Sequence, residues 1–208
     1  MRWKLFLAFF LCIVPLQAAD WPNWRGPGFN GISEETDWDP DRIENILWKV
    51  EVGTGFAGVA VAAGRVYTLG HDGRKSGGEE TVYCLDVKSG KKIWSDSYPA
   101  RLLPKLHEGG PAATPTIHGQ SAYTLGKDGK LNCYMAASGK KIWGRDVLAD
   151  SAMTRPAEWG FAGSPLIAGD ALIVEAAHTI AYHRESGKII WKSERFKPAY
   201  ATPVIFTY

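Results

Sequence analysis

The hexapeptide SGKKIW occurs twice in this chain of 208 residues, and the related SGKIIW occurs once. The copies end at Trp94, Trp143 and Trp191, so that successive tryptophans are 49 and 48 residues apart. Trp48, in the stretch ILWKVEV, precedes the first of them by 46 residues. A regular period of this length indicates a repeat architecture, in which each unit buries its apolar faces on its neighbours.

Each repeat consists of short runs in which apolar and polar residues alternate, separated by clusters of Gly, Asp and Ser. The runs GRVYTLG, TVYCLDV and KKIWS follow one another in the first repeat. This period of two residues indicates strands and no helix. A proline stands at the start of further strands, in ATPTI, GSPLI and ATPVI, where its missing N–H is tolerated. Four short strands per repeat are typical of a β-propeller blade, so we expect an all-β fold.

The repeats also predict how the chain is divided. Residues 48–53 are expected to be the outer strand of the closing blade, donated by the N-terminus after a lead-in over residues 20–47. Propellers have about four to eight blades, so three and a half blades predict the N-terminal part of a longer protein with seven or eight. The expected blades are residues 56–97, 112–146 and 162–194, with a fourth begun at 201–208.

The first nineteen residues have the pattern of an export signal. Arg2 and Lys4 precede an apolar run from Leu5 to Leu16, and the small residues of LQAAD follow. This order predicts a secretory signal peptide over residues 1–19. The apolar run is too short to span a bilayer. We therefore expect an exported protein, periplasmic or secreted, that does not span the membrane.

The charge balance of the chain argues against one class of partner. The sequence has 24 Lys plus Arg and 22 Asp plus Glu, and two of the basic residues lie in the predicted signal peptide. The mature chain is therefore formally neutral, and it contains no basic run. Nucleic-acid-binding proteins have a basic patch or stripe, so we expect no nucleic-acid partner.

Two cysteines remain after the signal peptide, and a disulfide is one reading of them in an exported protein. Cys84 and Cys133 lie 49 residues apart, which is one full repeat. Equivalent positions in neighbouring repeats point the same way, whereas a disulfide needs Cα atoms within about 7 Å of each other. Buried free thiols are the favoured interpretation.

The repeated hexapeptide has a structural interpretation. Its Ser-Gly pair suits a tight turn between the third and fourth strands, and its tryptophan can stack on the next blade. A role in holding a cofactor is disfavoured, because one site would not need a tryptophan in every blade. The residues predicted to dock blade on blade are Trp48, Trp94, Trp143 and Trp191, with the turn glycines Gly90, Gly139 and Gly187.

The segment CLDVKSGKKIW, from Cys84 to Trp94, resembles the tryptophan-docking motif of pyrroloquinoline-quinone-type propellers. The second and third repeats depart from the motif, with Met135 and His183 where the first has Asp86. On this alignment the small buried position holds Cys84, Cys133 and Ala181. The lead-in WPNWRGPGFNGIS is similar to the opening of exported bacterial quinoprotein-like propellers. Relatives of that kind include quinone-dependent alcohol dehydrogenases and the propeller lipoprotein of the outer-membrane β-barrel assembly machinery.

Loop length indicates which face of the propeller carries a site. The turns AAGR, IHGQ and IAGD are short, whereas the segments from Gly70, Tyr98 and Leu148 are long and all belong to the other face. Long loops on a rigid scaffold are where binding residues gather. Their residues could bind an anionic or carbonyl-bearing ligand, or could simply seal the channel and pair with each other. The candidates are Arg101, His107, Glu108, Arg155, Glu158 and Trp159.

Two functions are compatible with these features. The first is a non-catalytic binding or scaffold module that presents its long-loop face to a protein or polysaccharide in the cell envelope. The second is a quinone-dependent dehydrogenase whose catalytic carboxylate and metal ligands are expected to lie partly beyond Tyr208, and only that reading brings in pyrroloquinoline quinone with calcium as cofactor. The sequence lacks the vicinal cysteine pair that many such dehydrogenases place beside the quinone, and no metal site or catalytic triad can be assigned. The sequence is compatible with an enzyme and with a non-catalytic protein.

Overall fold

The computed structural model describes residues 19–36, 39 and 45–206. The predicted signal peptide falls almost wholly on residues 1–18, outside the described residues, and therefore stays a prediction. No helix in the described ranges is long and apolar enough to cross a membrane.

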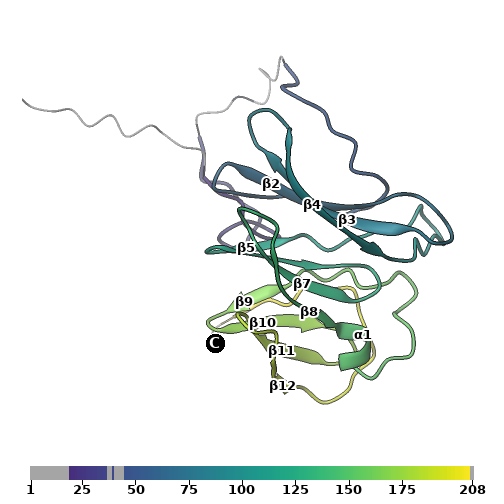
Figure 1. Ribbon diagram of the computed structural model, residues 1–208. Coiled ribbons are helices and arrows are strands. Elements are labelled where there is room, and N and C mark those ends of the chain that lie inside the picture. The colour runs from purple at the N-terminus through teal and green to yellow at the C-terminus, as the bar shows by residue number, and fades with distance from the viewer. Residues whose placement is uncertain (1–18, 37–38, 40–44, 207–208) are drawn as a thin grey trace, which may run out of the picture.

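The chain folds into three four-stranded antiparallel sheets, stacked one after another as Figure 1 shows. Within each sheet the strands lie in sequence order, which is the all-β propeller-blade arrangement that the alternating pattern predicted. The first sheet comprises β1 (Ala60–Ala62), β2 (Arg65–His71), β3 (Glu79–Asp86) and β4 (Lys92–Pro99). The second comprises β5 (Thr116–His118), β6 (Ser121–Leu125), β7 (Lys130–Met135) and β8 (Lys141–Asp146). The third comprises β9 (Leu166–Ala168), β10 (Ala171–Glu175), β11 (Thr179–His183) and β12 (Ile189–Lys192).

The third and fourth strands of every sheet pair in the same irregular way. A small residue lies directly opposite the repeat tryptophan, and the register shifts immediately after the small residue. An indole at this cross-strand position leaves space for only a small side chain, which accounts for the residue types found there. The pairs are Cys84 with Trp94, Cys133 with Trp143 and Ala181 with Trp191.

Cys84 and Cys133 lie in different sheets, and both are free and buried. Burial raises the pKa of each thiol to about 11. Because the thiolate is the reactive form, neither cysteine has the environment of a nucleophile or redox sensor at neutral pH.

Neighbouring sheets are joined by the indole of one and the glycine turn of the next. A Cβ atom at Gly139 would come within 2.6 Å of the Trp94 ring. Gly139 also has φ 72°, so both the turn and the contact require glycine. The indole Nε1 of Trp94 donates to the carbonyl of Ala136 at 2.8 Å, and the hydroxyl of Tyr67 donates to the same carbonyl at 3.2 Å. The first two blades thus share an apolar core with its polar atoms paired.

Hydroxyl groups link the inner edge of one blade to the next. The backbone N–H of Thr114 donates to Ser164 Oγ at 2.9 Å, and the N–H of Ser164 donates to Thr202 Oγ1 at 2.9 Å. These residues precede the prolines of ATP, GSP and ATP, so the proline-bearing strand starts are where the inner edges meet. The lead-in crosses the same edges. The backbone N–H groups of Trp21 and Val61 each donate to the other residue's carbonyl, and the N–H of Ile117 donates to the carbonyl of Pro22.

One local feature differs from the sequence pattern, and one predicted strand has no partner strand within the described residues. A single helical turn, α1 (Val147–Asp150), follows β8, where the pattern indicated no helix; the side chain of Asp146 caps it by accepting from the N–H of Ala149. Residues 48–53, predicted as a strand, lie outside every strand of the described chain. A strand forms only against a partner, and the first pairing beyond this segment is that of Thr54 with His71 at the end of β2.

Candidate functional site

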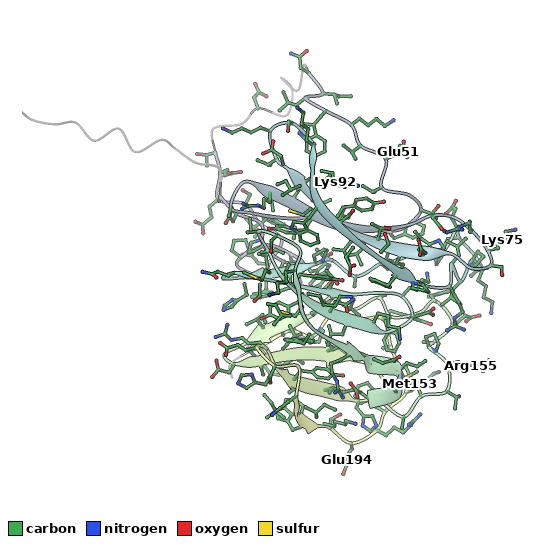
Figure 2. The ribbon with its side chains drawn as sticks, viewed as in Figure 1. Glu51, Lys75, Lys92, Met153, Arg155 and Glu194 are labelled. Atoms are coloured by element: carbon green, nitrogen blue, oxygen red, sulfur yellow. The ribbon has the colours of Figure 1, made fainter. Side chains whose placement is uncertain are left out.

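The long loops gather on one face of the molecule. They connect β2 to β3, β4 to β5, and β8 through α1 to β9. Figure 2 shows Lys75 and Arg155, from the first and third of these loops, on the same side of the molecule. We call this surface the long-loop face; the described residues 72–78, 100–115 and 151–165 form it.

The loop after β4 is fixed to the second blade by an arginine. Arg101 donates its backbone N–H to Asp128 Oδ2 at 2.9 Å and its guanidinium Nη2 to Asp128 Oδ1 at 2.8 Å. These hydrogen bonds raise the pKa of Arg101 above its ordinary value. An arginine whose backbone and guanidinium both bind one carboxylate loses little further conformational freedom when it meets a ligand.

The loop before β9 is fixed to the same turn of the second blade. The N–H of Phe161 donates to the carbonyl of Lys127 at 2.9 Å, and the N–H of Val147 donates to the carbonyl of Gly129 at 2.8 Å. The turn at Lys127, Asp128 and Gly129, between β6 and β7, therefore positions both long loops. We call it the anchor turn.

A buried carboxylate beneath the anchor turn was missed by the sequence analysis. Glu80, on β3 of the first blade, is fully buried, and its two oxygens accept the N–H of Lys127 at 3.0 and 3.2 Å. The hydroxyl of Tyr98 donates to Glu80 Oε2 at 3.2 Å. Burial raises the pKa of Glu80 to about 7, although these two donors favour its charged form. Burial likewise lowers the pKa of Lys127, whose side chain is also buried.

The two long loops also contact each other directly. Lys105 forms an ion pair with Glu158, and the ring of His107 lies 6.5 Å from that of Trp159. Glu158, His107 and Trp159 thus take part in contacts between the two loops. Arg101 is paired instead with the anchor turn.

His107 and Trp159 belong to a row of aromatic rings across the inner edge of the long-loop face. Phe56 meets His107 edge-on at 4.8 Å, and Trp159 lies 5.0 Å from Tyr200. The Nε1 atom of Trp159 is buried without a hydrogen-bond partner among the described residues. We call Phe56, His107, Trp159 and Tyr200 the aromatic row.

A cleft of about 640 Å³ lies between the two long loops of this face. Arg155, one of the predicted site residues, is exposed in its wall, whereas Glu108 is exposed elsewhere on its loop. We call this hollow the loop cleft; its lining residues are Arg101, Leu103, Pro104, Lys105, Arg155, Pro156, Ala157 and Glu158.

The predicted docking residues lie in the blade framework, away from the loop cleft. Trp48 lies against Gly90 and donates its Nε1 to the carbonyl of Val87 at 2.9 Å. Trp143 lies against Gly187 and donates to the carbonyl of Arg184 at 3.0 Å. Trp191, on the last sheet, is 46% exposed.

The calcium ion of the dehydrogenase reading finds no matching donor set in the described residues. Protein-bound calcium takes six to eight oxygen ligands, largely from carboxylates. The described ranges place no group of three or more His, Cys, Asp or Glu side chains where they could hold a metal ion. We derive no chemical step through this cofactor pair.

Solved structures with the same fold include several quinoprotein dehydrogenases. A europium-containing methanol dehydrogenase aligns with 86% of this chain at a TM-score of 0.66 and 16% identity, and the chain covers 32% of it. The quinohemoprotein alcohol dehydrogenase of Comamonas testosteroni aligns with 85% at a TM-score of 0.63 and 19% identity, with 28% of it covered. The chain thus spans less than a third of the length of these structures, and the likeness concerns the fold. No curated protein matches the sequence.

A family model provides the more specific comparison. The model described as outer membrane protein assembly factor BamB matches residues 41–154 and, in a second register, residues 109–193. Two overlapping matches are expected where one repeat pattern recurs along a chain. Together they cover most of the sequence, and the chain therefore belongs to this family of pyrroloquinoline-quinone-like repeat propellers.

Proposed function

We propose that this chain is an exported binding or scaffold module of the cell envelope, which presents its long-loop face to a protein or polysaccharide partner. One observation supports the proposal above all. Two loops from different blades are fixed to a single anchor turn, through Arg101 and Phe161, although neither loop is needed to complete a sheet.

Fixed loops favour binding because a surface that is already ordered loses little entropy when a partner docks. The buried hydrogen bonds of Glu80 also hold the anchor turn in place. Burying a carboxylate and a lysine is costly, and such groups are rare in a core whose only role is packing. Export is proposed from the signal-peptide pattern of residues 1–19.

Site-specific crosslinking tests which face meets the partner. A photo-crosslinking amino acid replaces Leu106, which is 81% exposed in the loop after β4, and the matched control replaces exposed Gln120 in the short β5–β6 turn. In intact cells, a defined envelope adduct is expected from position 106 and not from position 120. Adducts from position 120 alone, or from neither position, would contradict the proposal.

The dehydrogenase alternative is tested with the purified full chain. Pyrroloquinoline quinone and Ca²⁺ are titrated together, and the quinone absorbance and alcohol-dependent dye reduction are followed. Micromolar binding with turnover would replace the binding-module proposal by the enzymatic one. Failure to bind in this range removes the alternative.

A further inference from the structure

A second cleft adjoins the loop cleft and extends it towards the first blade. It measures about 490 Å³ and shares Arg101 with the loop cleft. We call it the hairpin cleft, because the β2–β3 hairpin loop forms one wall; its lining residues are Lys75, Ser76, Gly77, Gly78, Pro99, Ala100, Arg101 and Asp128. Two hollows joined at one arginine form a track suited to an extended ligand rather than to a compact one.

Positive charge predominates along this track. Four cationic side chains line the two clefts, against the carboxylates of Asp128 and Glu158. Both carboxylates are already engaged, by Arg101 and by Lys105. Lys75 and Arg155 are exposed and have no ion-pair or hydrogen-bond partner within the described residues.

The free and the paired cations have different places on the track. Arg101 is fixed at the junction of the clefts by its backbone and guanidinium bonds to Asp128. Lys75 and Arg155 lie in the separate clefts on either side of that junction, and both are visible along one side of the molecule in Figure 2. A ligand with negative charges spaced along its length would meet a free cation at each end and a pre-positioned one between them.

The apolar part of the lining favours one class of polymer. In the loop cleft it consists of Leu103, Pro104, Pro156 and Ala157, all of them aliphatic. Flat aromatic rings, which offer extended stacking surfaces to planar or cyclic ligands, belong to the aromatic row, and none of these rings lines either cleft. Aliphatic walls with flanking cations are better suited to aliphatic and carboxylate side chains than to sugar rings.

We infer that the loop and hairpin clefts together bind an acidic segment of a partner polypeptide in an extended conformation. This inference rests on the proposed function and names the kind of partner. Aspartate or glutamate side chains of the segment pair with Lys75 and Arg155, and its aliphatic side chains lie against Leu103 and Pro156.

The test measures binding of a short fluorescent oligo-glutamate peptide to the full chain by anisotropy at low salt. Oligo-glutamine serves as the uncharged control, and oligogalacturonate presents carboxylates on a saccharide. Tighter binding of oligo-glutamate than of either other probe, weakening as salt screens the exposed charges, is the expected result. Equal or tighter binding of oligogalacturonate would overturn the polypeptide assignment.

Matched double variants locate the binding. The variant Lys75→Gln with Arg155→Gln is expected to weaken oligo-glutamate binding by about tenfold, since exposed ion pairs each contribute modestly. The control variant Lys92→Gln with Lys140→Gln removes the same charge from exposed positions outside both clefts, and is expected to bind as the unmodified chain does. An equal loss in both variants would show only a net-charge effect and would overturn the inference.

Failure of the inference can be told from failure of the proposed function. If oligo-glutamate does not bind but position 106 still forms an envelope adduct, the long-loop face binds something else and the acidic-segment inference is wrong. If oligo-glutamate does not bind and position 106 forms no envelope adduct, the acidic-segment inference and the proposed function are both wrong. Binding that depends on Lys75 and Arg155 supports the inference.

Discussion

The blade framework and the long-loop face of this molecule are held together by different kinds of contact. In the framework one contact recurs: an indole lies against a glycine turn of the next blade, as for Trp94 with Gly139 and Trp143 with Gly187. On the long-loop face the contacts are single, and Arg101 with Asp128 is an example. Holding similar blades together requires a contact that is repeated, whereas recognising one partner requires features that occur once. The two regions should therefore respond differently to substitution.

The largest difference is expected between two tryptophans. Trp94→Ala removes a side chain that is only 8% exposed between two blades, and large-to-small changes of this kind cost about 3 to 5 kcal/mol. Trp159→Ala removes a partly buried ring from a face loop, where about 1 to 2 kcal/mol is expected. Urea denaturation of the two full-length variants, followed by far-UV circular dichroism, gives the comparison.

Crosslinking from position 106 provides a second comparison of the Trp94→Ala and Trp159→Ala variants. Trp159→Ala is expected to alter crosslinking from position 106, because its ring helps to hold the loop of His107. Trp94→Ala should leave crosslinking unchanged under conditions in which the variant stays folded. Equal urea midpoints for the two variants would contradict the division into framework and face.

A smaller effect is expected from adding one methyl group to a turn. Gly139→Ala places a Cβ within 2.6 Å of the Trp94 ring at a residue with φ 72°. Gly119→Ala is the matched control, because it has φ 56° and no atom within 4 Å of the added Cβ. The control variant should lose about 1 kcal/mol of unfolding free energy through backbone strain alone. The Gly139 variant should lose about 2 kcal/mol more, because the added methyl group displaces the indole. Equal losses would mean that the indole contact contributes little.

The framework could be predicted from the sequence because its determinants are local and repeated. Three copies of a hexapeptide at a constant spacing identify the turn, the fourth strand and the tryptophan together, and the strand pairing of Cys84 with Trp94 follows from their places in one hairpin. The closing strand expected at residues 48–53 stays a prediction, since a strand forms only against a partner and these residues have none within the described residues.

The anchor turn could not be predicted, because its character arises from contacts between blades. Glu80 looks like an ordinary polar residue of an alternating strand, and Lys127 lies in the run GKDGK, which is typical of an exposed turn. Both are buried because the second blade brings Lys127 onto Glu80, 47 residues away in the sequence. The only available signal was that GKDGK has no counterpart in the third repeat, where the corresponding stretch is EAAHT.

The pH dependence of the free energy of unfolding should report the titration of Glu80. The pKa of Glu80 is raised from 4.5 to about 7 in the folded state, so between these values the folded chain holds a proton that the unfolded chain has lost. The contribution of Glu80 to the free energy of unfolding is therefore full below pH 4.5 and declines as pH rises towards 7. The expected slope is about 1.4 kcal/mol per pH unit.

Glu80→Gln cannot lose a proton and should flatten this dependence between pH 4.5 and 7, as measured by urea midpoints at several pH values. Glu79→Gln, on the neighbouring and more exposed residue, is the control that changes the same charge. The lowered pKa of Lys127 acts in the opposite direction, because over its titration range the folded chain binds fewer protons than the unfolded chain. An unchanged slope in Glu80→Gln would show that this carboxyl does not titrate in the assigned window.

The smallest effect is expected at the position opposite the repeat tryptophan. Cys84→Ala reproduces what the third blade already has at Ala181, so its cost should stay below about 1 kcal/mol. Cys84→Leu adds volume directly opposite Trp94 and should cost about 1 to 3 kcal/mol through overpacking. Because the thiol is buried and its pKa is raised, a thiol reagent should label Cys84 only when the chain unfolds. Rapid labelling of the folded chain, or a Cys84→Ala variant as unstable as Cys84→Leu, would mean that the position is selected for its sulfur rather than for its size.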